Sequence, residues 1–341
     1  MSIFTKLLWA SLGAFGTLTA SAQLTATEQF PHASLRGLYA VNENVIWVSG
    51  SNGTVGRSID GGITWTRVTV PGFTGRDFRD IHAFDDHTAV IMGIDTPAVI
   101  LHTADAGAHW TVALRDSTPG MFLDAMDFTE DMGIVVGDPV ETKTGKRFYI
   151  AMTTNEGRNW RPERNTPGAD SGEACFASSG SNIRWVMDAD FGFPVFVSGG
   201  TQSRLHETKS SSWDSLPLLQ GATSTGANSI DGYRRTWIVV GGDFQRDTLT
   251  TGNCTYSTDL GHHWQIPHTP PHGYRSCVIH VKGDTWLCCG TSGIDISKDG
   301  GDNWTLISKE SFHVAAYSGS GKYVILAGAR GRIARLDWTK F

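Results

Sequence analysis

The sequence predicts an all-β fold, a seven-bladed β-propeller of four-stranded antiparallel blades whose ring is closed by an N-terminal strand. An eight-residue phrase, Ser/Thr-x-Asp/Asn-x-Gly-x-x-Trp, occurs five times along the chain. Each copy sits within a longer unit of short β-rich segments separated by Gly, Asn and Asp turns. The 341 residues include 40 Gly and 12 Trp, a turn-rich composition. Four-strand units that repeat every 40 to 50 residues or so are typical of propeller blades.

The first residues predict an export signal. Lys6 supplies a positive charge, residues 7–20 form a short apolar run, and Ala20-Ser21-Ala22 is a small-x-small cleavage site. We therefore expect a signal peptide over residues 1–22 and a secreted or periplasmic location. Residues 23–341 then form a single propeller domain. After cleavage we expect no membrane span, since no later segment approaches the roughly 20 apolar residues that one needs.

Repeating units follow the signal in order. The first unit contains four β-rich segments, at residues 35–41, 45–49, 54–57 and 65–70. Seven units each carry a tryptophan that begins the outer segment, at positions 65, 110, 160, 213, 264, 304 and 338, and the phrase is eroded at 213 and 338. The last unit lacks an outer strand, whereas residues 23–30 belong to no unit. We expect this N-terminal segment to close the ring, which removes an open sheet edge.

The repeated phrase is interpreted as structural. Its Asp can accept hydrogen bonds from turn N–H groups, Gly61 or Gly62 can adopt a positive φ, and the Trp packs between neighbouring blades. The expected structural residues are Asp60, Trp65, Asp105, Trp110, Asn155, Trp160, Asp259, Trp264, Asp299 and Trp304. A ring of Asp residues that binds metal or sugar is the less favoured interpretation, because each Asp is occupied by its own turn.

Candidate binding residues lie just before the innermost strand of each unit, where seven segments converge on the central channel. Reading the units in register gives Arg36, Arg79, Asp80, His82, Asp124, Glu173, Asn228, Tyr274, Arg275 and His313. The loops between second and third strands add Asp138, Asp243 and Arg330. Guanidinium and carboxylate groups in one concave site suit a polar ligand with anionic and hydroxyl groups. The alternative is that the Arg and carboxylate side chains in the channel pair with one another, so that they satisfy only each other's hydrogen bonds and bind no ligand.

The remaining chemistry is sparse. A net charge of -6 without a basic stripe argues against nucleic acid as a partner. Of five Cys, Cys277 and Cys288 would face each other if Val281 faces Asp284 across a hairpin, so a disulfide is one possibility and buried free thiols the other. No His lies at zinc-finger spacing from these Cys, and no cofactor-binding fingerprint is present. We expect no metal and no cofactor.

Several phrases carry a resemblance to known families. The repeated phrase resembles the Asp-box, or BNR repeat, of sialidases and other propellers. With Gly-Asp-Pro-Val140, Gly-Glu-Ala-Cys-Phe-Ala177, Gly-Tyr-Arg-Ser276, Gly-Thr-Ser-Gly293 and Gly-Ala-Arg-Gly-Arg-Ile-Ala-Arg335, residues 30–341 are similar to exported propellers of the photosystem II stability/assembly factor type. The photosynthetic members are assembly chaperones, so this resemblance implies a protein partner.

Two functions follow as hypotheses. The first is an exported binding or assembly module with a polar central site. The alternative is a carbohydrate-active enzyme, sialidase-like or another glycoside hydrolase or lyase, that acts on a polar or anionic carbohydrate. The sialidase residue types are present in Arg36, Arg79, Arg275, Tyr274, Glu173 and Asp80, but the Arg-Ile-Pro element is missing. Two channel carboxylates about 5–10 Å apart and unpaired with Arg favour an enzyme, whereas carboxylates locked to Arg favour binding.

Overall fold

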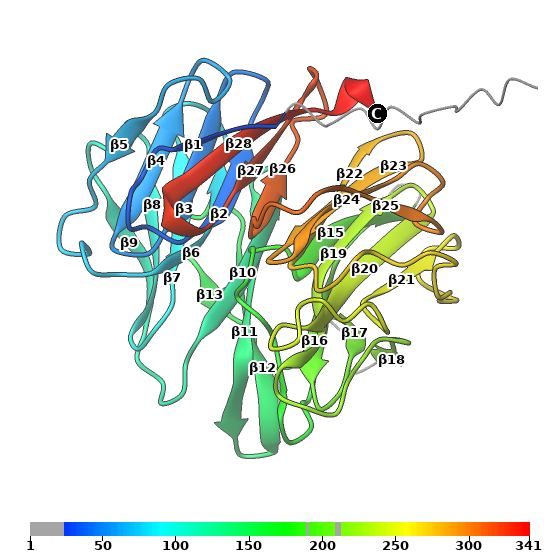
Figure 1. Ribbon diagram of the computed structural model, residues 1–341. Helices are drawn as coiled ribbons and strands as arrows, with labels where there is room; N and C mark the ends of the chain where they lie inside the picture. Colours follow the sequence, from blue (N-terminus) through cyan, green and yellow to red (C-terminus); the bar gives the residue numbers. More distant parts are fainter. Residues whose placement is uncertain (1–23, 189–190, 209–212) are drawn as a thin grey trace, which may run out of the picture.

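The computed structural model describes residues 24–188, 191–208 and 213–341. The predicted signal peptide, residues 1–22, lies outside this range. The described residues form antiparallel strands β1–β28 and two short 3-10 turns, η1 (Ala329–Gly331) and η2 (Trp338–Lys340). They contain no helix that is long and apolar enough to cross a membrane. The sheets stand around a common centre in the order of the chain, as Figure 1 shows, and the predicted all-β propeller is confirmed.

Five sheets have four strands each. The first two contain β2 (Leu35–Ala40), β3 (Ile46–Gly50), β4 (Thr54–Ser58) and β5 (Thr66–Val68), then β6 (Phe78–Ala83), β7 (Ala89–Gly93), β8 (Ala98–Thr103) and β9 (Thr111–Asp116). The third contains β10 (Leu123–Thr129), β11 (Met132–Thr142), β12 (Gly145–Thr153) and β13 (Arg161–Pro162). Two more contain β22 (Cys277–Lys282), β23 (Thr285–Gly290), β24 (Gly293–Ser297) and β25 (Trp304–Ser308), then β26 (Val314–Ala316), β27 (Tyr323–Ala327), β28 (Arg332–Asp337) and β1 (Leu24–Glu28).

The sixth sheet has eight strands. It contains β14 (Glu173–Ala174), β15 (Ile183–Asp188), β16 (Phe191–Gly200), β17 (Arg204–Glu207), β18 (Trp213–Ser215), β19 (Thr225–Tyr233), β20 (Thr236–Asp243) and β21 (Cys254–Ser257). A single residue pair, Gly199 with Gly226, joins β16 to β19. The hydrogen-bonded sheets therefore number six in the described chain, and a count of seven blades stays a prediction that rests on dividing this sheet at that pair.

Strand β1 closes the ring as expected. It pairs antiparallel with β28, from Leu24 opposite Leu336 to Glu28 opposite Arg332. The outer edge of the last sheet is thereby covered by the first strand of the chain, and residues at the two ends of the sequence lie side by side (Figure 1).

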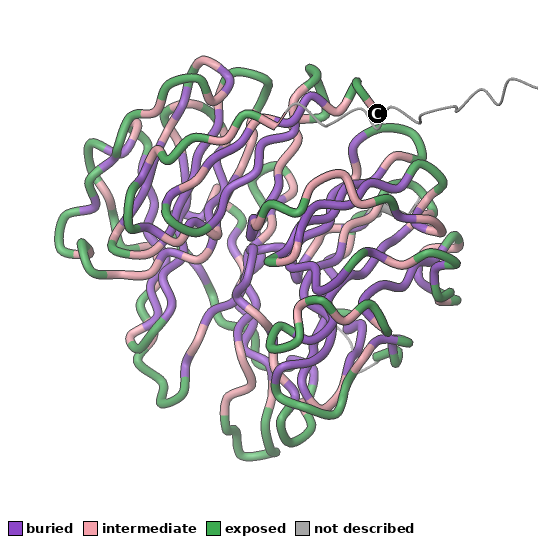
Figure 2. The backbone as a smooth tube through the Cα atoms, in the orientation of Figure 1, coloured by how far each residue is buried: buried purple, intermediate pink, exposed green. Residues whose placement is uncertain are grey.

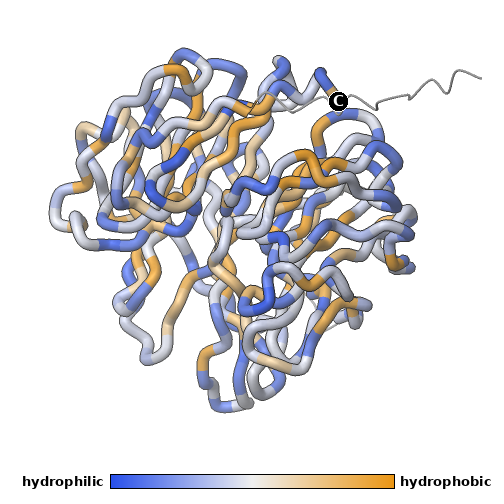
Figure 3. Tube along the Cα trace, in the orientation of Figure 1, coloured by the Kyte–Doolittle hydropathy of each residue, from blue (hydrophilic) through white to orange (hydrophobic). Residues whose placement is uncertain are grey.

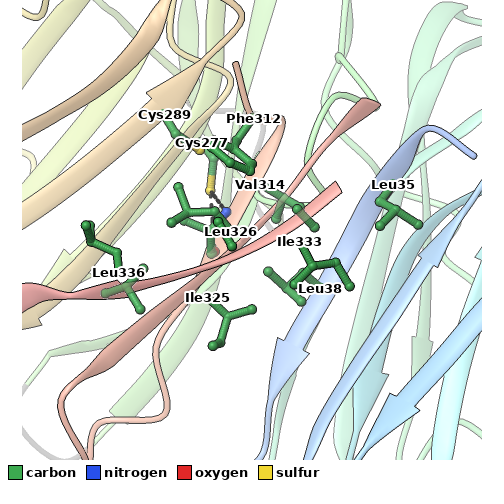
Figure 4. Packing of buried hydrophobic residues seen from close by; sticks show 14 of the residues in the cluster. Leu35, Leu38, Cys277, Cys289, Phe312, Val314, Ile325, Leu326, Ile333 and Leu336 are labelled. Atoms are coloured by element: carbon green, nitrogen blue, oxygen red, sulfur yellow. Dashed lines mark hydrogen bonds between the residues drawn. The ribbon is translucent and has the colours of Figure 1, made fainter. Parts of the chain in front are cut away.

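Apolar side chains gather within the sheets and between neighbouring sheets, while the exposed, hydrophilic positions lie mainly at the turns (Figures 2 and 3). One cluster joins the last sheet to both of its neighbours: it includes Leu35 and Leu38 of β2, Leu326 of β27, and Cys277 and Cys289 (Figure 4). Burial of such surfaces between blades, rather than one central core, holds the ring together, because the channel itself is lined by polar groups.

The repeated phrase makes the same turn each time. In the first copy, Ser58 Oγ donates to Asp60 Oδ1 over 2.8 Å, and the Thr64 N–H donates to the same carboxylate oxygen over 2.9 Å. Both glycines that follow Asp60 have positive φ, 73° at Gly61 and 79° at Gly62. Hydrogen bonds from Thr64 chiefly lower the pKa of Asp60 to about 2. The Asp-box carboxylate is thus occupied by its own turn.

The tryptophans of the phrase differ in their polar partners. The indole N–H groups of Trp65, Trp160 and Trp304 donate to the carbonyl of the glycine three residues earlier. Within the described chain, those of Trp110 and Trp264 have no partner. Packing of the ring, rather than this one hydrogen bond, is therefore the property that all five copies share.

Of the two possibilities for the cysteines, the structure has buried free thiols and no bridge between Cys277 and Cys288. All five cysteines are free and buried, and β22 pairs Cys277 with Cys289, whereas Cys288 pairs with Val278. The hairpin turns with Lys282 opposite Thr285, not with Val281 opposite Asp284, and a register irregularity between His280 and Lys282 then sets Cys277 opposite Cys289. A shift of one residue exchanges the faces of a strand, so the sulfur of Cys289, not that of Cys288, lies toward Cys277.

Candidate functional site

Four inner strands share a β-bulge at their start. The register of β2 against β3 slips between Leu35 and Gly37, and β6, β10 and β19 slip at the equivalent place. The residues left unpaired are Arg36, Arg79, Asp124 and Asn228. A bulge re-aims the side chain of the extra residue. All four of these side chains line one cavity.

This cavity, of about 550 Å³, lies at the end of the channel where the inner strands begin. Seven of the predicted binding residues line it: Arg36, Arg79, Asp124, Asp138, Asn228, Tyr274 and His313. Three phenylalanines also contribute, and Phe244 is 44% exposed. The size and the mixture of aromatic and polar groups are typical of a ligand-binding pocket.

A segment of the chain crosses the channel and forms the floor of the cavity. We call residues 174–182 the plug. Ala177 and Ser178 offer their carbonyl oxygens to Arg79 and Arg36, at 2.9 and 3.1 Å. Further along, Ser179 Oγ donates to the carbonyl of Ser276 over 2.6 Å. Residues 174–178 line this cavity and residues 179–181 line a second one of about 320 Å³, so the plug divides the channel into two ends.

Two carboxyl groups in the cavity are short of partners. Asp124 is fully buried, and neither of its oxygens accepts a hydrogen bond of ordinary geometry among the described residues. The backbone N–H groups of Ala177 and Asp138 lie near it and offset only part of the effect of burial on its pKa. Asp138 Oδ1 accepts the N–H of Cys175 over 3.0 Å. Burial, and then the neighbouring Asp138, raises the pKa of Asp124 well above its usual range, and burial raises the pKa of Asp138 to about 6. Neither carboxylate forms an ion pair with Arg in the described structure.

Both arginines of the cavity have hydrogen-bond partners. Arg79 pairs with Asp77 over 2.8 Å in addition to its bond to the plug. Burial and the nearby Arg79 lower the pKa of Arg36, but a guanidinium remains charged in proteins. On the opposite wall, the hydroxyl of Tyr274 donates to Asn228 Oδ1 over 2.8 Å. Burial lowers the pKa of His313 to about 4, so this imidazole is neutral at pH 7.

Two predicted residues lie at the other end of the channel. Asp80 and His82 line the 320 Å³ cavity beyond the plug. Asp80 accepts the N–H groups of Ile81 and Met126 over 2.8 and 2.7 Å. His82 packs against Tyr39 and Phe128, with ring centroids 4.1 and 4.4 Å apart. Since side chains alternate along a strand and Asp80 follows the bulge, it cannot join Arg79 at the same site.

The other four predicted residues line neither of these two cavities. Glu173 pairs with Arg204 over 2.9 Å, Asp243 pairs with Arg246 over 2.7 Å, and Arg330 lies 3.7 Å from Glu28.

Arg275 is wholly buried and bonds Asp295. In the first sheet, Ser49, which precedes the last glycine of β3, pairs with Gly37. In the β22 sheet, Cys289, which precedes the last glycine of β23, pairs with Cys277. Ser276, not Arg275, is therefore in register with Arg36, and it lines the cavity.

Sequence reasoning missed the aromatic walls. Phe122 precedes β10, Phe176 belongs to the plug and Phe244 follows β20. The rings of Phe176 and Phe244 meet edge to face with centroids 5.8 Å apart. Phe122 lies two residues before Asp124, and Phe244 follows Asp243 directly, and the repeat register selects both of these Asp residues. Large apolar residues beside those loop positions were the available signal.

Known proteins share both the sequence and the fold. A family model described as photosynthesis system II assembly factor YCF48 matches residues 35–318. Photosystem II assembly lipoprotein Ycf48 of Synechococcus sp. (strain CC9902) is 26% identical over 261 residues, which cover 75% of this chain and 69% of that protein. Photosystem II stability/assembly factor HCF136, chloroplastic, of Arabidopsis thaliana is 32% identical over 118 residues, 33% of this chain and 26% of that protein.

A solved structure of YCF48 bound to D1 peptide superposes with a TM-score of 0.63 at 16% identity, and the match covers 94% of this chain and 99% of that one. At this identity the structural likeness shows the fold alone. The extent of the family-model match shows more: this chain belongs to the family of the photosynthesis system II assembly factor YCF48.

Proposed function

We propose that this chain is an exported assembly module that holds a segment of a partner protein in the 550 Å³ cavity. Two findings support the proposal, membership of an assembly-factor family and a structural relative bound to a peptide, and the signal peptide that the sequence predicts agrees with export. The observation that carries it is the set of four bulges, which bring Arg36, Arg79, Asp124 and Asn228 from four sheets into one opening.

The chemistry of the opening suits a peptide. An extended chain presents both N–H donors and carbonyl acceptors, together with apolar side chains. The cavity offers guanidinium donors, an acceptor carboxylate, and the exposed ring of Phe244. Arg36 has five N–H donors and uses one on the plug within the described structure. The others are available to a ligand.

Selection from a random peptide library by the purified mature protein tests this proposal. We expect peptides whose affinity falls at least tenfold in the double variant Arg36→Ala/Arg79→Ala, and also in Phe244→Ala, which leaves the hydrogen bonds from Arg36 and Arg79 to the plug intact. Arg330→Ala is the matched control, since Arg330 is exposed and lies away from the cavity. Equal affinity for wild type and both cavity variants would place binding elsewhere and overturn the proposal.

One observation favours a second candidate, a glycoside hydrolase. Asp124 and Asp138 are two cavity carboxyl groups without an Arg partner in the described structure, and raised pKa values suit a general acid. Assay of the mature protein against a panel of aryl glycosides tests it. Hydrolysis that disappears in Asp124→Asn would favour this candidate. Absence of hydrolysis across the panel, with peptide binding retained, would exclude it for those substrates.

A further inference from the structure

We infer that the cavity receives a basic side chain, Lys or Arg, of the bound segment, and that Asp124 with Asp138 accepts its N–H donors. This inference rests on the proposed function and names the chemistry that the partner segment must carry. It starts from an unusual feature of the cavity, a buried carboxyl group that no side chain of the described residues pairs with.

Asp124 carries that carboxyl group. It is 0% exposed, neither carboxyl oxygen accepts a hydrogen bond of ordinary geometry among the described residues, and the side chain lines the cavity. A buried polar group left without a partner costs about 1–3 kcal/mol. The β10 bulge holds the group in this position. The fold therefore maintains an unfavourable acceptor in the wall of the cavity.

A cation matches this acceptor better than a neutral donor. Asp138 lies beside Asp124 and adds a second negative charge. The nearest protein cation, Arg79, is already engaged by Asp77 and by the carbonyl of Ala177. Ammonium and guanidinium groups donate to carboxylates in charge-assisted hydrogen bonds, which are roughly twice as strong as neutral ones.

The walls fit the stem of such a side chain. Phe122 and Phe176 line the same cavity as the carboxyl pair. The aliphatic part of Lys or Arg packs well on aromatic rings while its charged end reaches a polar group. Arg36 lies in the same cavity, so a cation at the carboxyl pair leaves a separate anchor for a backbone carbonyl.

The pairing predicts a pH dependence. Binding of a cation requires ionised carboxyl groups, so affinity falls as pH decreases through the raised pKa values of the pair. The other ionisable groups of the cavity are Arg36, Arg79, Cys175, Tyr274 and His313. Burial keeps Tyr274 and His313 neutral between pH 5 and 8, and it raises the pKa of Cys175, so the carboxyl pair dominates the change.

Titration of the mature protein with three blocked pentapeptides tests the inference by NMR. The probes are acetyl-Ala-Ala-Lys-Ala-Ala-amide and its analogues with norleucine or Nε-acetyl-lysine at the centre. We expect the lysine peptide to bind at least tenfold more tightly than either analogue at pH 8, and this preference to vanish at pH 5. Asp124→Asn should abolish it. Asp243→Asn is the matched control, since Asp243 is paired with Arg246 outside the cavity.

The outcomes separate this inference from the proposed function. Equal affinity for the lysine and norleucine peptides, with loss of both in Phe244→Ala, would overturn the inference and leave peptide binding in place. Failure of all library and lysine peptides to bind would overturn both. Retention of the lysine preference in Asp124→Asn would also contradict the inference. Thermal unfolding of that variant, expected at or above the wild-type temperature, shows that any lost binding does not come from unfolding.

Discussion

The Asp-box turns and the channel bulges are two repeated features with opposite characters. Each turn keeps its backbone geometry and an Asp or Asn side chain, whose Oδ1 is satisfied locally. The bulges keep only the backbone geometry: the residue they present is Arg, Arg, Asp or Asn. Constant side chains on a constant backbone indicate a scaffold. Varied side chains on a constant backbone indicate a surface shaped for one irregular ligand.

Replacement of an Asp-box tryptophan should have the largest effect on stability. Trp304 is 2% exposed and packs with Ile238 and Val278 between neighbouring sheets. We expect Trp304→Ala to destabilise the protein by about 3–5 kcal/mol through the cavity that it leaves, measured by urea unfolding. Trp65→Ala, at a half-buried copy, should cost less. Equal losses of unfolding free energy in the two variants would show that the contribution of each tryptophan does not depend on how deeply it is buried.

A channel substitution should act in the opposite direction. We expect Asp124→Asn to stabilise the protein by about 1–3 kcal/mol at pH 8, because a neutral amide costs less to bury than an ionised carboxylate. Asp124 and Asp138 have raised pKa values in the folded protein, so their contribution to folding stability is fully present at pH values below the unfolded pKa of about 3.9. That contribution is lost as pH rises through the folded values, about 6 for Asp138.

Urea unfolding at pH 4, 6 and 8 measures this effect. The wild type should lose stability across that interval relative to Asp124→Asn. A variant that is less stable at pH 8 would mean that Asp124 supports the fold, and the contrast between channel and turn would fail.

Loss of an Asp-box carboxylate should be intermediate. Asp299 Oδ1 accepts the Asn303 N–H and the Ser297 hydroxyl, both over 2.9 Å. We expect Asp299→Ala to cost about 1 kcal/mol in unfolding free energy, the usual net value of such bonds at a partly exposed site. Peptide affinity at the cavity should not change. A fall in affinity would connect the periphery to the site and weaken the distinction between them.

The smallest effect concerns the turn backbone. The residue after the Asp or Asn has a positive φ in all five copies, and it is Ala106 in the second copy, with φ 62°. We expect Ala106→Gly to stabilise the protein by about 0.5–1 kcal/mol, because the left-handed region is strained for Ala but not for Gly.

Differential scanning calorimetry of three proteins measures the change. Gly107→Ala is the opposing control, since its new Cβ would lie 2.2 Å from a methyl group of Val68. A lower melting temperature for Ala106→Gly than for wild type would contradict the explanation.

Sequence periodicity predicted the sheets, the closing strand and the turn chemistry, because each depends on local patterns that repeat. It placed Arg36, Arg79, Asp124 and Asn228 together, since they share one position in the repeat. It failed for Arg275, where the register differs by one residue, and for Asp80, which the bulge turns to the other end of the channel. It failed for Glu173 because residues 174–182 are inserted before β15. Such shifts are set by tertiary contacts, which a repeat alone does not encode.

The pairing of β1 with β28 has a consequence for how the protein is made. The first strand must find a partner that lies about 300 residues later, so its contact order is close to the maximum that the chain allows. At about 5–20 residues per second, a ribosome needs roughly 15–60 s to reach that partner. During this interval β1 is an unpaired strand, and the finished ring is the first species in which it is sheltered. Closure of the ring therefore has to wait until nearly the whole chain has been made.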